Sequence, residues 1–175
     1  HCSHLEYVSQ DFCQYEGQGG GAPAEGLQSK SWDTSRIDLV SDITAIPMPD
    51  SSFDAILCSE VLEHVPEPTH ALDEFARLLK PGGILLVKIA DQVARGRFQW
   101  QLVELVNRAR AAGWTPCDCY VKVRKTPMFG GHVTGATRRS HAPKRHCYWV
   151  VLRPGSNCYP SDAQTGWSKA AARAV

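Results

Sequence analysis

The sequence predicts an α/β protein with a mostly parallel sheet, and three features of residues 37–87 support that prediction. Short apolar runs recur at 37–41, 53–58 and 84–87. Their apolar residues are consecutive rather than alternating, which indicates strands covered on both faces. Between the last two runs, apolar residues at helical spacing predict a helix; they are Ala71, Phe75, Leu78 and Leu79. Acidic and small polar residues follow two of the strands, at the edge where open α/β sheets bind ligands.

The flanking segments extend this pattern. Pro81-Gly82-Gly83 should end the first helix, because proline cannot continue a helix and glycine accepts a left-handed turn. A second helix is expected over 100–112, and residues 119–123 and 147–152 should pair as an antiparallel hairpin at the sheet edge. A further short strand is expected within 1–9, followed by a glycine-containing loop over 14–36.

Length and composition favour a single domain over residues 1–152, with a disordered tail over 153–175. The chain has no apolar run of about 18 residues and no charged-then-apolar leader, so we expect a cytoplasmic protein without a membrane span. Seven cysteines fit no zinc spacing, and we expect them to be reduced and mostly packed in the interior. Because the first residue is His1, the sequence is expected to be a piece of a longer chain.

Charge is divided unevenly along the chain. Residues 1–74 hold 14 of the 18 acidic residues and only 2 of the 19 basic ones, so the second half is basic. Such asymmetry favours a polyanionic partner for the second half, although opposite charges facing each other within the fold would explain it equally well. The basic segment 122–146 is expected to contain a long loop over 124–146.

The central blocks of the sequence resemble class I S-adenosylmethionine-dependent methyltransferases of the broad type-11-like kind. The resemblance spans residues 7–88, and its spacing is specific because several linked blocks match together. They are Asp42-Ile43, Pro47-Met48-Pro49-Asp50, Ser52-Phe53-Asp54, Glu60-Val61-Leu62-Glu63-His64 and Leu78-Leu79-Lys80-Pro81-Gly82-Gly83. The resemblance implies a Rossmann-like sheet, the cofactor S-adenosyl-L-methionine and transfer of a methyl group to an unidentified acceptor.

The resemblance also implies cofactor-binding positions. Asp11, with Phe12 beside it, falls where the family has an acidic residue for the ribose, and a carboxylate can accept from two hydroxyls. Asp42 falls where the adenine amine is held and Ile43 where the ring is packed, while Ser59-Glu60 follows the strand that lines the pocket. The alternatives are a surface or capping role for Asp11, and a turn aspartate beside a core isoleucine at 42–43.

Neither the sequence nor the resemblance predicts a catalytic residue or a metal site. Glu63-His64 looks like an acid–base pair, but adjacent side chains on a helical turn do not face each other, so His64 is expected to be structural or to line the substrate. Gly17-Gln18-Gly19-Gly20-Gly21 resembles the cofactor glycine loop, yet it neither follows a buried strand nor precedes a helix. The true first strand and its glycine loop are therefore expected upstream of His1, and the chain is expected to be truncated at its N-terminus.

The second half resembles the C-terminal parts of bacterial and phage DNA amino-methyltransferases. The similar residues are Val87-Lys88, Asp91-Gln92-Val93, Gly96-Arg97, Ala112-Gly113-Trp114, Arg139, His141, Arg145, His146 and Tyr148. However, Ser59-Glu60-Val61-Leu62 stands where those enzymes carry the motif that holds the target amine, which argues against base methylation by that route.

Two alternatives to a methyltransferase of unidentified acceptor therefore remain open. One is an inactive fragment, and the other is a protein of this fold that binds or modifies DNA or RNA. The residues expected to contact phosphates are Arg124, Lys125, Arg138, Arg139, Lys144 and Arg145.

Overall fold

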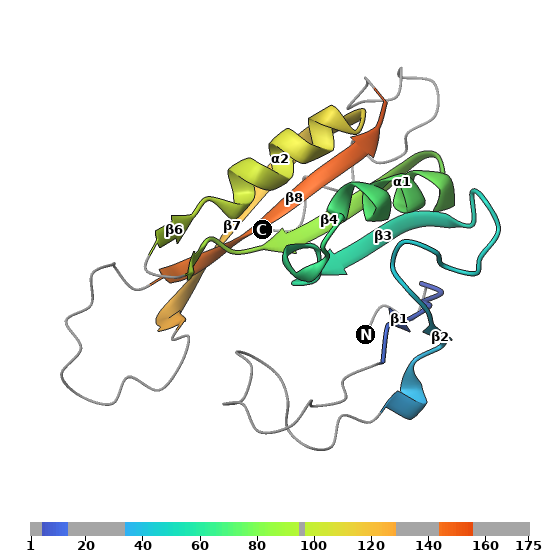
Figure 1. The fold of residues 1–175 in the computed structure, drawn as a ribbon, viewed down its shortest axis with the longest axis horizontal. Coiled ribbons are helices and arrows are strands. Elements are labelled where there is room, and N and C mark those ends of the chain that lie inside the picture. Colours follow the sequence, from blue (N-terminus) through green and yellow to red (C-terminus); the bar gives the residue numbers. More distant parts are fainter. Residues whose placement is uncertain (1–4, 14–33, 95–96, 129–143, 156–175) are drawn as a thin grey trace.

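A four-stranded sheet in the order β3-β4-β8-β7 forms the centre of the computed structural model, which describes residues 5–13, 34–94, 97–128 and 144–155 (Figure 1). β3 (Phe53–Ser59) and β4 (Leu79–Ile89) are parallel. β8 (Lys144–Pro154) lies between β4 and β7 (Trp114–Met128) and is antiparallel to both. Strands β3, β4 and β7 therefore run in one direction and β8 in the other, which confirms the predicted α/β sheet with an antiparallel C-terminal hairpin.

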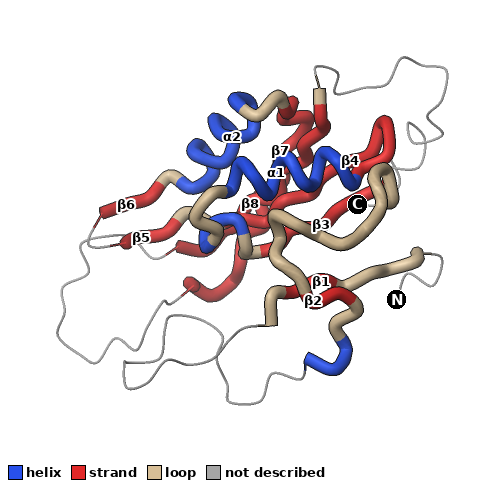
Figure 2. The backbone as a smooth tube through the Cα atoms, turned by 45° about the vertical axis from the view of Figure 1, so that its right-hand side comes forward, coloured by secondary structure: helices blue, strands red, loops and turns tan. Residues whose placement is uncertain are grey.

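Two small strand pairs flank the main sheet, as Figure 2 shows. β1 (Gln10–Asp11) and β2 (Leu39–Val40) are parallel, and β5 (Gln92–Ala94) and β6 (Arg97–Gln99) are antiparallel. The helices are η1 (Thr34–Arg36), η2 (Leu62–His64), α1 (Pro68–Leu78) and α2 (Gln101–Ala111).

The two long helices form where the apolar spacing predicted them. α1 begins at Pro68, a residue whose fixed φ and missing N–H suit the first helical position. It buries one face, made of Ala71, Leu72, Phe75 and Leu78. α2 buries Leu105 and Ala109 in the same way. Each helix is thus held by an amphipathic face rather than by propensity alone.

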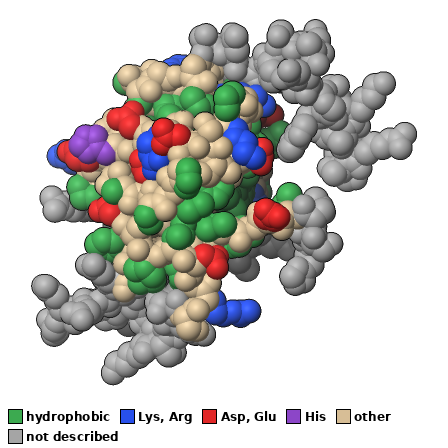
Figure 3. Space-filling view, turned by 90° about the vertical axis from the view of Figure 1, so that its right-hand side faces the viewer, with side chains coloured by type: hydrophobic (Ala, Val, Ile, Leu, Met, Phe, Trp, Pro, Cys, Tyr) green, Lys and Arg blue, Asp and Glu red, His purple; other side chains and the backbone are tan. Residues whose placement is uncertain are grey.

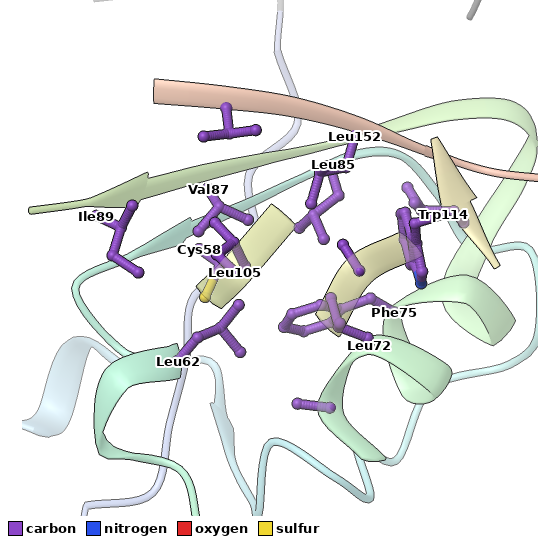
Figure 4. Close-up of a cluster of buried hydrophobic side chains, with 14 of the residues drawn as sticks. Cys58, Leu62, Leu72, Phe75, Leu85, Val87, Ile89, Leu105, Trp114 and Leu152 are labelled. Carbon is purple, nitrogen blue, oxygen red and sulfur yellow. The ribbon is translucent and has the colours of Figure 1, made fainter. Parts of the chain in front are cut away.

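One hydrophobic core joins both helices to the sheet (Figure 4). On β4, Leu85, Val87 and Ile89 point into this core and are at most 2% exposed. β8 adds Val150 and Leu152 to the same cluster. Because α1 and α2 share this cluster, both lie on one face of the sheet.

The prediction that the strands are covered on both faces is wrong for the described residues. The residues of β4 that alternate with Leu85 and Val87, namely Ile84, Leu86 and Lys88, are only half-buried. Leu57, which pairs with Leu86, is 56% exposed. The apolar surface therefore continues onto the second face of the sheet. Figure 3, a view turned by 90° from that of Figure 1, shows apolar side chains among charged ones on the side that it presents.

The predicted turn at residues 81–83 lies inside β4 instead of before it. Phe53 pairs with Leu79, but Ala55 pairs with Ile84, so residues 80–83 form an irregularity within the strand. Gly82 has the positive φ that the turn signal predicted. The turn conformation was therefore predicted correctly. The pairing of β4 with β3 on both sides of the turn was not predicted.

Other predicted boundaries also need correction. The predicted hairpin strands extend well beyond 119–123 and 147–152, so residues 124–128 and 144–146 are strand and not part of a loop over 124–146. The N-terminal strand was expected within 1–9 but comprises Gln10–Asp11. Residues 14–33 with the glycine run, and 156–175 with most of the predicted tail, lie outside the described residues. Within the described part of the chain, no helix is long and apolar enough to cross a membrane.

Candidate functional site

Asp11 is the last residue of β1, and Asp42 follows the end of the neighbouring parallel strand β2 by two residues. Asp11 of β1 pairs with Val40, the last residue of β2. Just beyond this pair, the Ser41 N–H donates to the Asp11 carbonyl oxygen at 3.1 Å. Carboxyl ends of parallel strands meet at one edge, so the two carboxylates belong to the same edge of this small sheet. This placement suits a ligand that spans both strands.

Both aspartates accept hydrogen bonds through their carboxylates. The Thr44 N–H and hydroxyl donate to Asp42 Oδ1 at 2.8 and 2.7 Å. These bonds, the backbone one first, hold the pKa of Asp42 below its usual value, so the exposed carboxylate stays ionised. Asp11 Oδ1 accepts from the Cys13 N–H at 2.9 Å. Both groups can receive hydroxyl or amine donors.

The predicted apolar neighbours differ in burial. Ile43 packs against the main core and is half-buried. Phe12 is 46% exposed at the end of β1. Ile43 therefore packs on the core and is also partly accessible next to Asp42. The two roles considered from sequence, a core isoleucine and a residue that packs on the adenine ring, are compatible at this position.

Ser59 and Glu60 lie at the carboxyl end of β3, beside the end of β4. The Glu60 N–H donates to the Lys88 carbonyl oxygen at 3.1 Å, and Lys88 Nζ lies 2.8 Å from Glu60 Oε1. Glu60 has a φ of 59°, a left-handed conformation that is uncommon for a residue other than glycine. Two strand ends are thus joined by a strained residue and an ion pair, a feature typical of functional sites.

The remaining predicted site residues lie on other elements or outside the described residues. His64 is exposed on η2, and its N–H donates to the Val61 carbonyl oxygen at 2.8 Å. Arg124 and Lys125 lie on β7, and Lys144 and Arg145 begin β8. Arg138 and Arg139 lie outside the described residues.

A partly buried polar network at the start of β8 was not predicted as a site. The Tyr148 hydroxyl donates to Asp91 Oδ2 at 3.1 Å, and His146 Nε2 lies 2.9 Å from the same hydroxyl. Because a hydroxyl has one proton, His146 Nε2 is the donor in its bond. Asp91 is 5% exposed and also accepts from the Leu102 N–H at 3.2 Å, near the start of α2.

This network joins the end of β4, the start of α2 and the start of β8. Burial, followed by the bond to Asp91 and its charge, raises the pKa of Tyr148, so the phenol stays neutral and keeps its proton. The sequence offered two signals for it: Asp91 closely follows a predicted strand, and Asp91, His146 and Tyr148 all belong to the residues that resemble DNA amino-methyltransferases. The pairing with Tyr148, 57 residues away, is set by the tertiary fold.

No metal centre is evident in the part of the chain that the structure describes. Within it, no group of three or more His, Cys, Asp or Glu side chains is arranged to hold a metal ion. Five cysteines lie among the described residues, and two of them, Cys58 and Cys147, are buried.

The chain is similar to known methyltransferases through its central segment. Residues 17–87 match the family model described as a methyltransferase domain. The chain is 46% identical over 71 residues to a ubiquinone biosynthesis O-methyltransferase of Xanthomonas oryzae pv. oryzae, covering 41% of this chain and 29% of that protein. It is 42% identical over 77 residues to a demethylmenaquinone methyltransferase of Renibacterium salmoninarum, covering 43% of this chain and 32% of that protein.

One similar solved structure is a putative DNA modification methylase of Thermus thermophilus in complex with S-adenosyl-L-methionine. It is 21% identical, with a TM-score of 0.47, and the match covers 66% of this chain and 54% of that chain.

Residues 17–87 thus match a methyltransferase domain, the class that the motifs predicted. The chain spans about a third of the length of the curated relatives it matches.

Proposed function

We propose that this chain is an S-adenosylmethionine-dependent methyltransferase, or part of one, and that it methylates an oxygen of a small molecule. The main support is the match of residues 17–87 to the methyltransferase domain, together with relatives whose names specify O-methylation. The site geometry agrees, because Asp11 ends β1, Asp42 closely follows the end of the parallel strand β2, and both carboxylates are acceptors.

The residues present suit the cofactor. Asp42, ionised and exposed, would accept from the adenine amine, and Ile43 would pack against the ring. Asp11 would accept from the ribose hydroxyls, since one carboxylate can receive two donors. When bound, S-adenosylmethionine supplies a methyl group on a sulfonium centre, whose leaving group is already activated.

The protein's contribution to such a reaction is mainly positioning. Aligning two bound groups removes much of the entropic barrier to their reaction. The Glu60–Lys88 pair fixes the ends of β3 and β4 relative to each other, which would keep the floor of such a site rigid. This arrangement needs no dedicated catalytic residue.

Calorimetric titration with S-adenosylhomocysteine tests the cofactor site. Micromolar binding by the 175-residue chain, lost in Asp42→Ala but kept in Asp73→Ala, would support the proposal. Asp73 is a matched control because it is an exposed aspartate on α1. A folded chain that shows no binding would contradict cofactor binding by this chain.

The acceptor is tested separately. S-adenosylhomocysteine release is measured with a panel of small phenols and with the corresponding anilines. Release with phenols only would support an oxygen acceptor, whereas release with anilines only would overturn that part of the proposal.

The charge division of the chain favours a second candidate, in which the basic segment 122–146 binds DNA or RNA. Residues 75–175 hold 17 of the 19 basic residues. Lysine and arginine contacts to phosphates release counterions, so the affinity should fall steeply as salt increases. Binding to a random-sequence duplex that is weak and insensitive to salt between 50 and about 200 mM would eliminate this candidate.

A further inference from the structure

β7 forms one edge of the main sheet and has a strand partner on one side only, within the part of the chain that the structure describes. It is 15 residues long, and residues 118–123 pair with consecutive residues of β8, so this stretch is regular strand. An edge strand presents outward-pointing backbone N–H and C=O groups, which another strand can pair with. β7 is therefore a surface on which a sheet can be extended.

The same stretch carries apolar side chains at its surface. Val121, Val123 and Tyr120 are each more than half exposed. The two valines share one side of the strand and the tyrosine lies on the other, because side chains alternate along a strand. β-branched and aromatic side chains contribute to stability mainly by packing against a neighbour on the next strand. A strand added to this edge would cover apolar surface on both of its sides.

Two opposite charges are placed symmetrically about Tyr120. Asp118 lies two residues before it and Lys122 two residues after it, on the same side of the strand, and both are exposed. Four residues of strand span about 13 Å, so these two side chains cannot pair within one chain. Within the described ranges neither belongs to an ion pair, and the Asp118 carboxylate accepts a local hydrogen bond from the Cys119 N–H at 2.7 Å.

We infer that β7 pairs antiparallel with β7 of a second copy of this chain, across a two-fold axis that passes between the two Tyr120 residues. Asp118 of each copy then lies directly opposite Lys122 of the other, so a single pairing forms two ion pairs. Cys119 lies opposite Val121 in the same way. Directly opposite residues have Cβ atoms about 5 Å apart, which is close enough for such pairs to interact. The two four-stranded sheets thereby become one continuous sheet.

The positions of the charges favour this register. Charged side chains on an edge strand usually prevent pairing, but here they have opposite signs and attract across the axis. A pair centred on Lys122 would place two lysines opposite each other, which is destabilising. A pair centred on Val121 would place Lys122 opposite Tyr120 and Asp118 opposite Arg124. Exchanging the charges at 118 and 122 distinguishes that register from the one centred on Tyr120.

The other edge of the main sheet is less suited to a second copy. Asp54 is the one charged residue of β3, and it already pairs with Lys80 at 2.8 Å. A two-fold axis through β3 would therefore bring no opposite charges together. The inference concerns β7 alone, and it does not depend on the proposed methyl transfer.

Sedimentation velocity of the 175-residue chain at low ionic strength, over a range of protein concentrations, tests the pairing. We expect a reversible monomer–dimer equilibrium. Asp118→Lys and Lys122→Asp should each weaken the dimer about tenfold, because two attractions become two repulsions. The variant with both substitutions should recover the dimer. Asp73→Lys makes the same charge change at an exposed position on α1 and should leave the equilibrium unchanged.

A cross-link tests the register independently. Val121→Cys places a thiol opposite Cys119 of the other copy. Directly opposite residues of antiparallel strands have Cα atoms about 4.5–5.5 Å apart, which lies within the range that a disulfide spans. Mild oxidation should therefore give a covalent dimer that the unmodified chain does not form. Val103→Cys, an equally exposed position on α2, is the matched control and should behave like the unmodified chain.

Three results would overturn the inference. The first is a chain that stays monomeric at every concentration. The second is a dimer that both single variants leave intact, because it would use another surface. The third is a dimer that both single variants weaken and the double variant does not recover, because Asp118 and Lys122 would then not face each other. Circular dichroism of each variant confirms that it is folded.

Discussion

Arg77 is the residue that fixes the loop between β2 and β3 to the rest of the molecule. Its guanidinium donates to the carbonyl oxygens of Met48 and Ile46 at 2.8 and 3.0 Å. It also pairs with Glu74 and Asp50, each at 2.6 Å. This fork of five donors is a geometry that lysine could not reproduce. The loop that it holds contains Ile46, which contributes to the core.

Replacing Arg77 should therefore destabilise the fold. Arg77→Met removes the guanidinium donor from the Met48 and Ile46 carbonyl groups and from the Glu74 carboxylate, and we expect a loss of about 2 kcal/mol in the free energy of unfolding. Arg110→Met, on the exposed side of α2, serves as the matched control with a change below about 0.5 kcal/mol. Urea denaturation measures both, and equal stabilities would contradict the anchoring role.

Two adjacent glycines at the β4 irregularity serve different purposes. Gly82 has a φ of 82° and open space around the position of a Cβ. At Gly83, a Cβ would lie 3.0 Å from the Lys80 carbonyl oxygen and 3.1 Å from that of Asp54. The first glycine is required by backbone conformation and the second by close approach of two backbones.

Substitutions should separate these two requirements. Gly82→Asn should be tolerated within about 0.5 kcal/mol, because asparagine adopts the left-handed region more easily than most residues. Gly83→Ala should cost about 1–3 kcal/mol, since the neighbouring atoms belong to the backbone and cannot rotate away. Thermal unfolding would show the difference as a lower Tm for Gly83→Ala only. A larger loss for Gly82→Asn would show that conformation, not space, dominates here.

At the scale of the elements, β4 connects most of the fold. It pairs with β3 on one edge and β8 on the other. Its face toward the helices is fully buried at Leu85, while Leu57 on the neighbouring strand is largely exposed on the opposite face. Two leucines on adjacent strands thus have very different surroundings.

This difference predicts unequal costs of the same substitution. Leu85→Ala should lower the free energy of unfolding by about 2–5 kcal/mol, because it leaves a cavity in a packed core. Leu57→Ala should change it by less than about 1 kcal/mol, because little apolar surface is lost from the interior. Chemical denaturation of both variants makes the comparison. Similar losses would mean that the second face of the sheet is packed as firmly as the helix face.

The elements that the sequence predicted best are those specified by local patterns. α1 follows from its apolar spacing and Pro68, and Asp42 was located because it comes just after a short apolar run. β7 was predicted too short, since Pro116 before the predicted strand and the charged residues Arg124 and Lys125 after it are not typical of a strand. An edge strand tolerates such residues because one side of it lacks a partner in the sheet.

Contacts between distant residues explain what local patterns could not predict. The Asp91–Tyr148 bond joins residues 57 positions apart, and it exists only because β8 inserts next to β4. The ion pair between Glu60 and Lys88 likewise depends on the parallel pairing of β3 with β4. The candidate cofactor residues were thus predictable one at a time, while the networks that stabilise the site were not.

For the molecule as a whole, buried and hydrogen-bonded carboxylates make stability depend on pH in two opposite ways. The pKa of Glu74 is lowered, mainly by the hydrogen bond from Arg77. The pKa of Asp38 is lowered by bonds from Ser9, and that of Asp42 by bonds from Thr44. Glu63 differs, since burial raises its pKa. The first three favour the ionised form in the folded state, and Glu63 favours the neutral form.

These opposite shifts predict a maximum in a plot of Tm against pH. As pH falls below about 4.5, the unfolded chain takes up protons before Glu74, Asp38 and Asp42 do, so their contribution to stability is lost. As pH rises above about 4.5, the unfolded chain releases the Glu63 proton first, so the folded state loses stability through Glu63. Glu63→Gln should therefore flatten the high-pH side of the maximum and leave the acid side unchanged. Glu74→Gln should flatten the acid side instead. Differential scanning calorimetry between pH 3 and about 8 measures both curves. If Glu63→Gln left the high-pH side as steep as in the unmodified chain, another group would have to carry that dependence, and the Glu63 carboxylate would not be costly to ionise in the folded state.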